Sequence, residues 1–353
     1  MRIAESELRT ALQKLFVSAG LAEENAAVVT HCLMEAELAG IGTHGVAMTE
    51  AHLKKCRDGY DIGASLTVET EKTAFAVCHA HNMIGMLSAW QAMGLAVEKA
   101  RESGMYAVFC HHANTFSAAY CYVKYAAEQG MISYVSCNSP AQMAPWGGRE
   151  KLLGTNPLAV GIPARHEKPF LFDMATSAVA KSKINQALHN GDATIPFGWA
   201  TDGSGQPTND PKEAVKGLIL PMAGPKGYGL SMAIDMMAGL LSHAAYLDGV
   251  GRFYSDDNAC MNVGHMMVVI DPKTVYGESF YDEADAYLKR VRESAAAPAG
   301  TAASGNAVMA PGDINEAYRQ DALTNGVELP ERVVASLNRL LEEIGEESLS
   351  CRS

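Results

Sequence analysis

The sequence predicts an α/β protein, in which helices pack on a sheet, preceded by a small helical unit. Between residues 66 and 138 the patterns of strand and helix alternate, which is the order of an α/β layer arrangement. The first 62 residues instead repeat apolar side chains at helical spacing. With 48% hydrophobic and 19% charged residues, the chain can bury a sizeable core.

The first unit contains three predicted helices, and each ends at or just before a glycine. The helices are expected over residues 3–18, 23–38 and 45–58. The glycines that end them are Gly20, Gly40 and Gly59.

The rest of the chain divides into an α/β region, a linker and a closing segment. Strands are expected at 66–71, 74–80, 105–110, 131–138, 158–163, 170–175 and 266–272. Helices are expected at 88–104, 118–130, 177–189, 228–243 and 330–346. The boundaries are 1–62 for the helical unit, 63–290 for the α/β region, and 291–308 for a flexible linker rich in small residues.

Charge and cysteine usage exclude several classes of function. The net charge is −12, which argues against a surface for nucleic acid or anionic membranes. We find no run of about 18 apolar residues and no signal-like N-terminus, so we expect no membrane segment. The eight cysteines are scattered without a CxxC pair, which predicts a reduced, cytoplasmic protein without a bound metal. A small molecule is the expected ligand.

The segment GPKGYGL, residues 224–230, is the most informative motif. The chain has neither GxGxxG after a first strand nor GxxxxGK[ST], so any dinucleotide is bound without a Rossmann turn. The glycines allow close approach of a ligand, and unpaired amides at the start of the following helix, with Lys226, favour a phosphate. The alternative is a glycine-rich loop over a buried helix, with Lys226 in solvent.

Two further segments end strands with polar groups. In LFDMATS, residues 171–177, Asp173 is placed to bind ribose hydroxyls, and Thr176 or Ser177 is placed to cap the next helix. Capping alone is the alternative interpretation of this segment. In CNSP, residues 137–140, Ser139 can bond a cofactor amide or cap a turn.

His44 lies between two glycines in GTHGV, residues 42–46. Histidine is the side chain best suited to exchange protons near neutrality, and the glycines allow a substrate to approach. A structural turn histidine is the competing interpretation. His112, which follows a predicted strand, is a second candidate of the same kind.

Taken together and in this order, these segments resemble the malate/L-lactate dehydrogenase family of the non-Rossmann type. This family includes ureidoglycolate dehydrogenase, sulfolactate dehydrogenase and diketogulonate reductase, and the segment from Gly224 onward is most similar to the ureidoglycolate dehydrogenases. The matching segments are GTHGV (42–46), AAEQGMI (126–132), CNS (137–139), MAPWGG (143–148), GTNPLA (154–159), DMATS (173–177), IPFGWATDGSGQPTNDP (195–211), GPKGYGL (224–230) and MAPGDIN (309–315).

The resemblance implies a large mixed sheet that binds NAD or NADP, with NAD favoured, and hydride transfer at a carbonyl or hydroxyl carbon. It also implies a homodimer, with the helical N-terminal unit packing against the C-terminal segment, 309–353. By position in the family's motifs, His44 would lie at the substrate. The residues that would line the cofactor are Ser139, Asp173, Met174, Ala175, Lys226 and Gly227.

The chain departs from the family at the substrate. Thr115 stands where the family has a proton-donating histidine, and threonine has no proton with a pKa near 7. Met48 and Met261 stand where relatives have arginines, and His52 where they often have tyrosine. Methionine cannot form the bidentate contact of arginine with a carboxylate, a loss of about 2–5 kcal/mol in a buried site. We therefore expect a substrate less anionic and bulkier than a small 2-hydroxy acid.

Three sources of the proton stay open: His44, then His112, or a water held by Thr115. Two other functions also stay open. One is reduction of a cyclic imine, which Met48 opposes because the familiar imine substrates are carboxylates. The other is a degenerate protein that binds a dinucleotide or metabolite without redox chemistry.

Overall fold

A seven-stranded mixed sheet forms the centre of the computed structural model, which describes residues 1–254, 259–298 and 307–352. β3 and β4 are parallel, and every other neighbouring pair in this sheet is antiparallel. The predicted mixed sheet is thus confirmed. In spatial order its strands are β2 (Thr67–Glu71), β3 (Phe75–His79), β4 (Met105–Ala113), β10 (Val263–Ile270), β5 (Ile132–Cys137), β6 (Leu158–Ile162) and β7 (Phe170–Met174).

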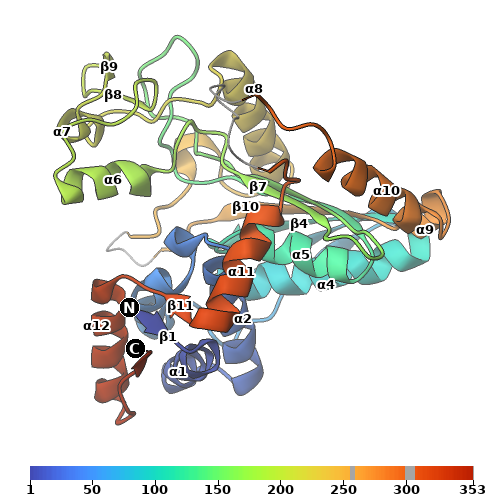
Figure 1. Ribbon diagram of the computed structural model, residues 1–353, viewed down its shortest axis with the longest axis horizontal. Helices are drawn as coiled ribbons and strands as arrows, with labels where there is room; N and C mark the ends of the chain where they lie inside the picture. Colours follow the sequence, from blue (N-terminus) through green and yellow to red (C-terminus); the bar gives the residue numbers. More distant parts are fainter. Residues whose placement is uncertain (255–258, 299–306, 353) are drawn as a thin grey trace.

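Helices cover both faces of the sheet (Figure 1). One face carries α4 (Gly85–Ser103) and α5 (Tyr120–Glu128). The other carries α8 (Pro225–Ile234), which continues directly into the π-helical segment η3 (Asp235–Leu240). The sheet is therefore a buried middle layer, and its loops are the places where a ligand can reach the chain.

Alternating side chains on β10 build these two faces. Met267 and Val269 belong to the main core under α4 and α5, whereas Met266 and Val268 belong to a second cluster that includes residues of α8 and η3. A strand turns successive side chains to opposite faces, so an apolar run such as this one fits a strand covered on both sides.

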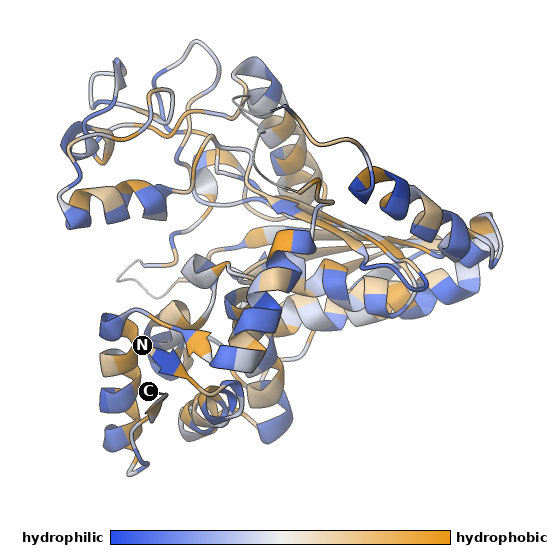
Figure 2. Ribbon diagram, in the orientation of Figure 1, coloured by the Kyte–Doolittle hydropathy of each residue, from blue (hydrophilic) through white to orange (hydrophobic). Residues whose placement is uncertain are grey.

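The two ends of the chain form one unit, as the resemblance implied. Arg2 and Ile3 pair with strands from near residue 328 and from the C-terminus, and Figure 1 shows the two termini side by side. Polar and apolar residues alternate around the last helix (Figure 2). The elements of this unit are α1 (Glu5–Ser18), α2 (Glu23–Leu38), α3 (Thr49–Asp58), α11 (Asp313–Asn325), α12 (Glu331–Glu343), β1 (Arg2–Ile3), β11 (Val327–Glu328) and β12 (Cys351–Arg352).

A smaller region with its own apolar cluster lies at the α6 end of the molecule (Figure 1). Among the described residues, no helix is long and apolar enough to span a bilayer. The remaining elements are α6 (Lys181–Asn190), β8 (Ala200–Thr201), β9 (Pro207–Thr208), α7 (Pro211–Ala214), η4 (Leu247–Gly249), α9 (Pro272–Val275) and α10 (Phe280–Arg292).

The predicted helix over 45–58 is wrong at its start. Two 3-10 turns, η1 (Gly42–His44) and η2 (Val46–Met48), precede α3. A Cβ on Gly45 would overlap the carboxylate of Glu37, so the chain wraps around this side chain before the helix begins. His44 and Met48 consequently lie on a folded loop.

Two other boundaries differ from the sequence prediction. The helix expected from residue 177 begins at Lys181, because the hydroxyls of Thr176 and Ser177 donate to carbonyls instead of capping it. α10 extends through Arg292, two residues into the expected linker. Residues 299–306 of that linker lie outside the described residues.

Candidate active site

The His44 loop is held in place by a buried carboxylate. Glu37 Oε2 accepts a hydrogen bond from the Val46 backbone N–H at 2.9 Å. Burial raises the pKa of Glu37, although this hydrogen bond acts in the opposite direction. The imidazole of His44 is exposed, and its Nδ1 lies 3.0 Å from the hydroxyl of Thr43. Desolvation by the surrounding chain lowers the pKa of His44, so the ring is mainly neutral at pH 7.

The segment that contains Thr115 meets this loop. The hydroxyl of Ser117 donates to the backbone carbonyl of His44, and Thr115 itself is partly buried two residues earlier. The side-chain amide of Asn114 donates to Asn82 Oδ1 at 2.9 Å and to the Met83 carbonyl at 3.0 Å. His44 and the Thr115 segment therefore come together from opposite ends of a 70-residue interval in the sequence.

Met261 and Met48 are almost wholly buried. Met261 is 3% exposed, and its backbone N–H donates to Asn114 Oδ1 at 3.1 Å. Met48 is 8% exposed and belongs to the same apolar core as Met261. No charged group stands at either position, so neither contributes a cation to the region around Thr115.

His52 is fully buried, which limits what it can do. Its Nδ1 lies 3.0 Å from the hydroxyl of Tyr60, and its Nε2 has no hydrogen-bond partner among the described residues. Burial, and secondarily the charge of Lys55, lower the pKa of His52 to about 3. The ring is therefore neutral at pH 7 and presents no atom to solvent in this structure.

Sequence reasoning missed His265, a buried histidine behind Thr115. His265 lies on β10, and its Nε2 is 2.9 Å from the carbonyl of Asn114. Its Nδ1 has no partner within the described parts of the chain, and its ring centroid lies 4.8 Å from that of Phe116. Burial lowers its pKa to about 4, against the opposing effect of the Asn114 carbonyl. Its place inside an apolar strand pattern gave no sign of this contact.

Ser139 is tied to α8 through a residue that the sequence did not single out, Asn156. The Ser139 backbone N–H donates to Asn156 Oδ1 at 3.0 Å, and Asn156 Nδ2 donates to the Ser231 carbonyl at 2.9 Å. The Ser231 hydroxyl in turn donates to the Gly154 carbonyl at 3.0 Å. Asn156 is fully buried, so it fixes three of the sequence motifs against one another.

Asp173 lies at the end of β7 and caps the start of α5, which precedes it in the chain. From the sequence, capping was considered only for the helix that follows this segment. Asp173 Oδ2 accepts a hydrogen bond from the Tyr120 N–H at 2.8 Å, at the start of α5. Burial raises the pKa of Asp173 to about 6, although the Tyr120 N–H lowers it. Met174 and Ala175, which follow, are partly buried. The Thr176 N–H then donates to the Thr155 carbonyl at 2.9 Å.

Lys226 and Gly227 lie in the first turn of α8. Lys226 is exposed, and Gly224 before it has a φ of +63°. A Cβ on Gly227 would overlap the Met222 carbonyl, so this glycine is required for packing inside the protein. A Cβ on Gly224 would lie 3.1 Å from the ring of Trp146, which brings the MAPWGG and GPKGYGL segments together.

These groups fit a dinucleotide by their chemistry. Lys226 suits a pyrophosphate through its side chain and its backbone N–H, because Pro225 has no N–H and the next two amides donate to the carbonyls of Met222 and Gly224. Asp173 Oδ1 has no hydrogen bond among the described residues and suits a ribose hydroxyl. The hydroxyl of Ser139 is partly exposed beside them. The donor set is thus compatible with the cofactor that the resemblance implies.

A pocket of about 600 Å³ lies away from these residues. It is lined by the loop around Gly148, the turn around Gly203 and the segment around Gly217. None of the predicted catalytic or cofactor residues lines it. Because it lacks the chemistry described above, we assign it no part in the candidate site.

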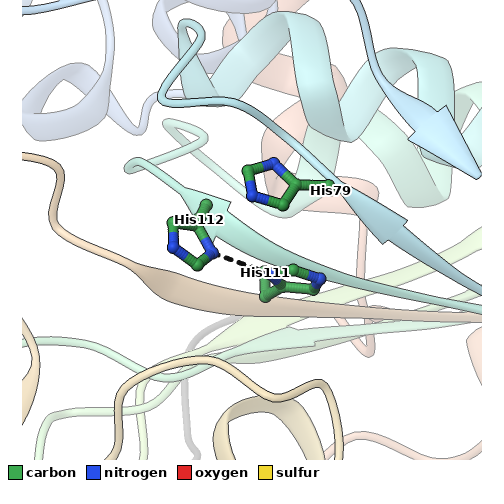
Figure 3. A group of neighbouring side chains, drawn as sticks. All are labelled: His79, His111 and His112. Atoms are coloured by element: carbon green, nitrogen blue, oxygen red, sulfur yellow. Dashed lines mark hydrogen bonds between the residues drawn. The ribbon is translucent and has the colours of Figure 1, made fainter. Parts of the chain in front are cut away.

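His112 lies together with two other histidines, His79 and His111 (Figure 3). Its Nδ1 lies 2.7 Å from Nδ1 of His111, and its backbone N–H donates to Asn262 Oδ1 at 2.8 Å. The ring centroids of His112 and His79 are 4.4 Å apart. Burial and then the neighbouring His111 lower the pKa of His112.

Residues 3–338 match the malate/L-lactate dehydrogenase family model. The chain is 33% identical to the L-sulfolactate dehydrogenase of Methanothermobacter thermautotrophicus, over 98% of this chain and 97% of that one. It is 32% identical to the ureidoglycolate dehydrogenase (NAD(+)) of Escherichia coli O157:H7, over 93% of each. The solved sulfolactate dehydrogenase of Methanocaldococcus jannaschii superposes with a TM-score of 0.90 at 30% identity, covering 98% of both chains.

These similarities place the chain among the dehydrogenases built on a large mixed sheet without a Rossmann turn. The chain belongs to the malate/L-lactate dehydrogenase family. The resemblance drawn from its sequence motifs is thereby confirmed.

Proposed function

We propose that the protein is an NAD(P)-dependent oxidoreductase that interconverts a carbonyl and a hydroxyl group on an uncharged or bulky substrate. One observation carries the proposal. The exposed His44 and the cofactor-side groups are retained, whereas Thr115, Met48 and Met261 replace the charged or acidic groups of the family's substrate side. The bound nicotinamide would accept or supply the hydride.

The residues on the cofactor side of the site would hold the dinucleotide in place for this hydride transfer. Lys226 would hold the pyrophosphate with its side chain and its backbone N–H at the start of α8, and Asp173 would accept a hydrogen bond from a ribose hydroxyl. Ser139, fixed by Asn156, would bond the cofactor amide. We favour NAD, which one relative carries in its name, although the name of another carries NADP(+).

His44 moves the proton. During oxidation the neutral ring accepts the proton of the substrate hydroxyl while the carbon loses its hydride. During reduction the protonated ring returns that proton to the carbonyl oxygen. The contact between Thr43 and Nδ1 orients the ring and leaves Nε2 for the substrate.

The substrate half discriminates against small carboxylates. Because Met48 and Met261 bring no positive charge, a carboxylate beside them would lose water without gaining the bidentate ion pair that an arginine forms. A second candidate, reduction of a cyclic imine, is favoured by Thr115, since an imine arrives protonated and needs no strong acid.

We also propose a homodimer formed through α8 and η3. Five apolar side chains along these elements are between 42% and 54% exposed, which is unusual for a contiguous surface of a monomer. These side chains are Met232, Met236, Met237, Leu240 and Leu241. A second copy of the chain would cover them beside the proposed cofactor site.

Titration with NADH and NADPH, followed by nicotinamide fluorescence, tests whether the protein binds a dinucleotide at the proposed residues. We expect one cofactor to bind, and Lys226→Met to weaken its binding about 10- to 100-fold because a charged contact is lost. Lys212→Met, at an exposed lysine on α7, is the matched control and should bind normally. If neither cofactor bound the wild-type protein, the family would describe the fold and not the function.

A further inference from the structure

Three histidines from two parallel strands meet at one corner of the sheet. His79 ends β3 and is the direct register partner of His111 on β4, and His112 follows in the chain. One ring nitrogen from each lies within 4.8 Å of the other two. Figure 3 shows the three rings gathered at the ends of these strands.

A carboxylate orients the central histidine of this cluster. Glu69 Oε2 lies 2.8 Å from His111 Nε2 and accepts its proton in a hydrogen bond. The Nδ1 of His111 is then left with its lone pair, and it faces the Nδ1 of His112 at 2.7 Å. A carboxylate that fixes the tautomer of a ligand histidine is the usual second partner of protein metal sites.

We propose that His79, His111 and His112 bind one divalent transition-metal ion, with Glu69 as the positioning residue for His111. Imidazole nitrogens suit Zn²⁺, Ni²⁺ and Cu²⁺ and not Mg²⁺ or Ca²⁺. His112 is exposed and His79 partly exposed, so an ion reaches the cluster from solvent. Three protein ligands leave a fourth position for water.

The cluster needs only a small adjustment to hold the ion. Two nitrogens bound to Zn²⁺ at about 2.0–2.1 Å in tetrahedral geometry lie about 3.3 Å apart. The Nδ1 atoms of His111 and His112 therefore separate slightly, and His79 moves closer. His79 Nδ1 accepts a hydrogen bond from the His81 N–H at 2.9 Å.

No sequence motif pointed to this site, because His79 and His111 are 32 residues apart and form no CxxC or HxxxH spacing. The parallel pairing of β3 with β4 brings them together. This inference does not rest on the proposed function. It does assign His112 a task other than proton donation, since a metal-bound nitrogen has no lone pair to exchange a proton.

Zn²⁺ binding to untagged, chelator-treated protein tests the site, with a chromophoric chelator as competitor. We expect one equivalent per chain. His112→Ala, at an exposed position that the fold does not need, should abolish the stoichiometric site, as should His79→Ala. Glu69→Gln should weaken binding about 10- to 100-fold. His189→Ala, at an exposed histidine on α6, is the matched control and should bind as the wild type does.

Co²⁺ gives a second readout, because tetrahedral imidazole ligation produces strong visible absorption. The wild-type protein and His189→Ala should show it, and His112→Ala should not. The proposal is overturned if the wild-type chain shows no saturable binding. It is equally overturned if Zn²⁺ binds His112→Ala and the wild-type protein alike.

Discussion

At the scale of single residues, the position and the pKa of His44 depend on the loop that carries it. Glu37 holds the backbone at Val46, Ser117 binds the His44 carbonyl, and Thr43 contacts the ring. The surrounding chain lowers the pKa of His44 below its ordinary value of 6.5. A ring that is neutral at pH 7 is suited to accept a proton from a substrate hydroxyl.

The lowered pKa of His44 predicts the pH dependence of turnover. Oxidation needs the neutral ring, so its rate should be full above pH 6.5 and fall as pH drops through the lowered pKa. Reduction needs the protonated ring and should fall as pH rises through the same pKa. His44→Gln should reduce kcat about 100- to 10,000-fold in both directions and remove this limb of the profile.

The control for this experiment is His189→Gln, which changes an exposed histidine on α6. It should keep the wild-type profile, and His44→Gln should still bind the cofactor. Unchanged turnover in His44→Gln would assign the proton to another group.

The sequence singled out His44 on a loop and Asp173 at the end of a strand, but did not predict their contacts. Asp173 caps α5, which precedes it by some fifty residues, because strand β7 returns beside that helix. Asn156 and His265 were missed since buried polar residues give no periodic signal. Their roles depend on partners that only the fold supplies.

At the scale of elements, a buried apolar pattern made several helices predictable, whereas strand β2 was predicted although its residues are exposed. α12 buries five apolar residues at helical spacing and was predicted within a few residues. α10 has an apolar stripe at Phe280, Ala284, Leu288 and Val291, but only Leu288 is buried, and α11 buries only Ala322; both helices were missed. β1, β11 and β12 have two residues each, too few for an alternating pattern.

One buried ion pair fastens α11 to α2 and carries a stability prediction. Glu35 and Arg319 are in contact with side chains only 6% and 13% exposed. Arg319→Met should lower the free energy of unfolding by about 3–5 kcal/mol, because Glu35 then stays buried with fewer partners. Arg319→Met combined with Glu35→Leu should recover part of this loss. Urea unfolding of the three proteins measures both effects.

The same pair predicts how stability depends on pH. Burial alone would raise the pKa of Glu35, but Arg319 and Lys124 lower it overall, below 4.5. A carboxyl whose pKa is lower in the folded protein stabilises it above its unfolded pKa. That contribution should be present above pH 4.5 and disappear as pH falls through the lowered value, and it should be absent in Glu35→Leu. Equal acid sensitivity of both proteins would contradict this account.

At the scale of the whole molecule, the apolar surface of α8 and η3 predicts the oligomeric state. The wild-type protein should be a dimer by light scattering, and Met236→Asp with Leu240→Asp should give a monomer, because two charges would be buried in the interface. Leu188→Asp, at an exposed leucine on α6, should leave the dimer intact. A monomeric wild-type protein would contradict the proposal.

The central claim is that the substrate side of this dehydrogenase no longer recognises a carboxylate. The most direct measurement compares kcat/KM for 2-oxo acids and for their neutral amides, which differ in charge and little in shape. Without an arginine at Met48 or Met261, the amide should be reduced at least as well as the acid. A preference for the acid of about 10-fold or more would show that another cation has taken the place of the arginines.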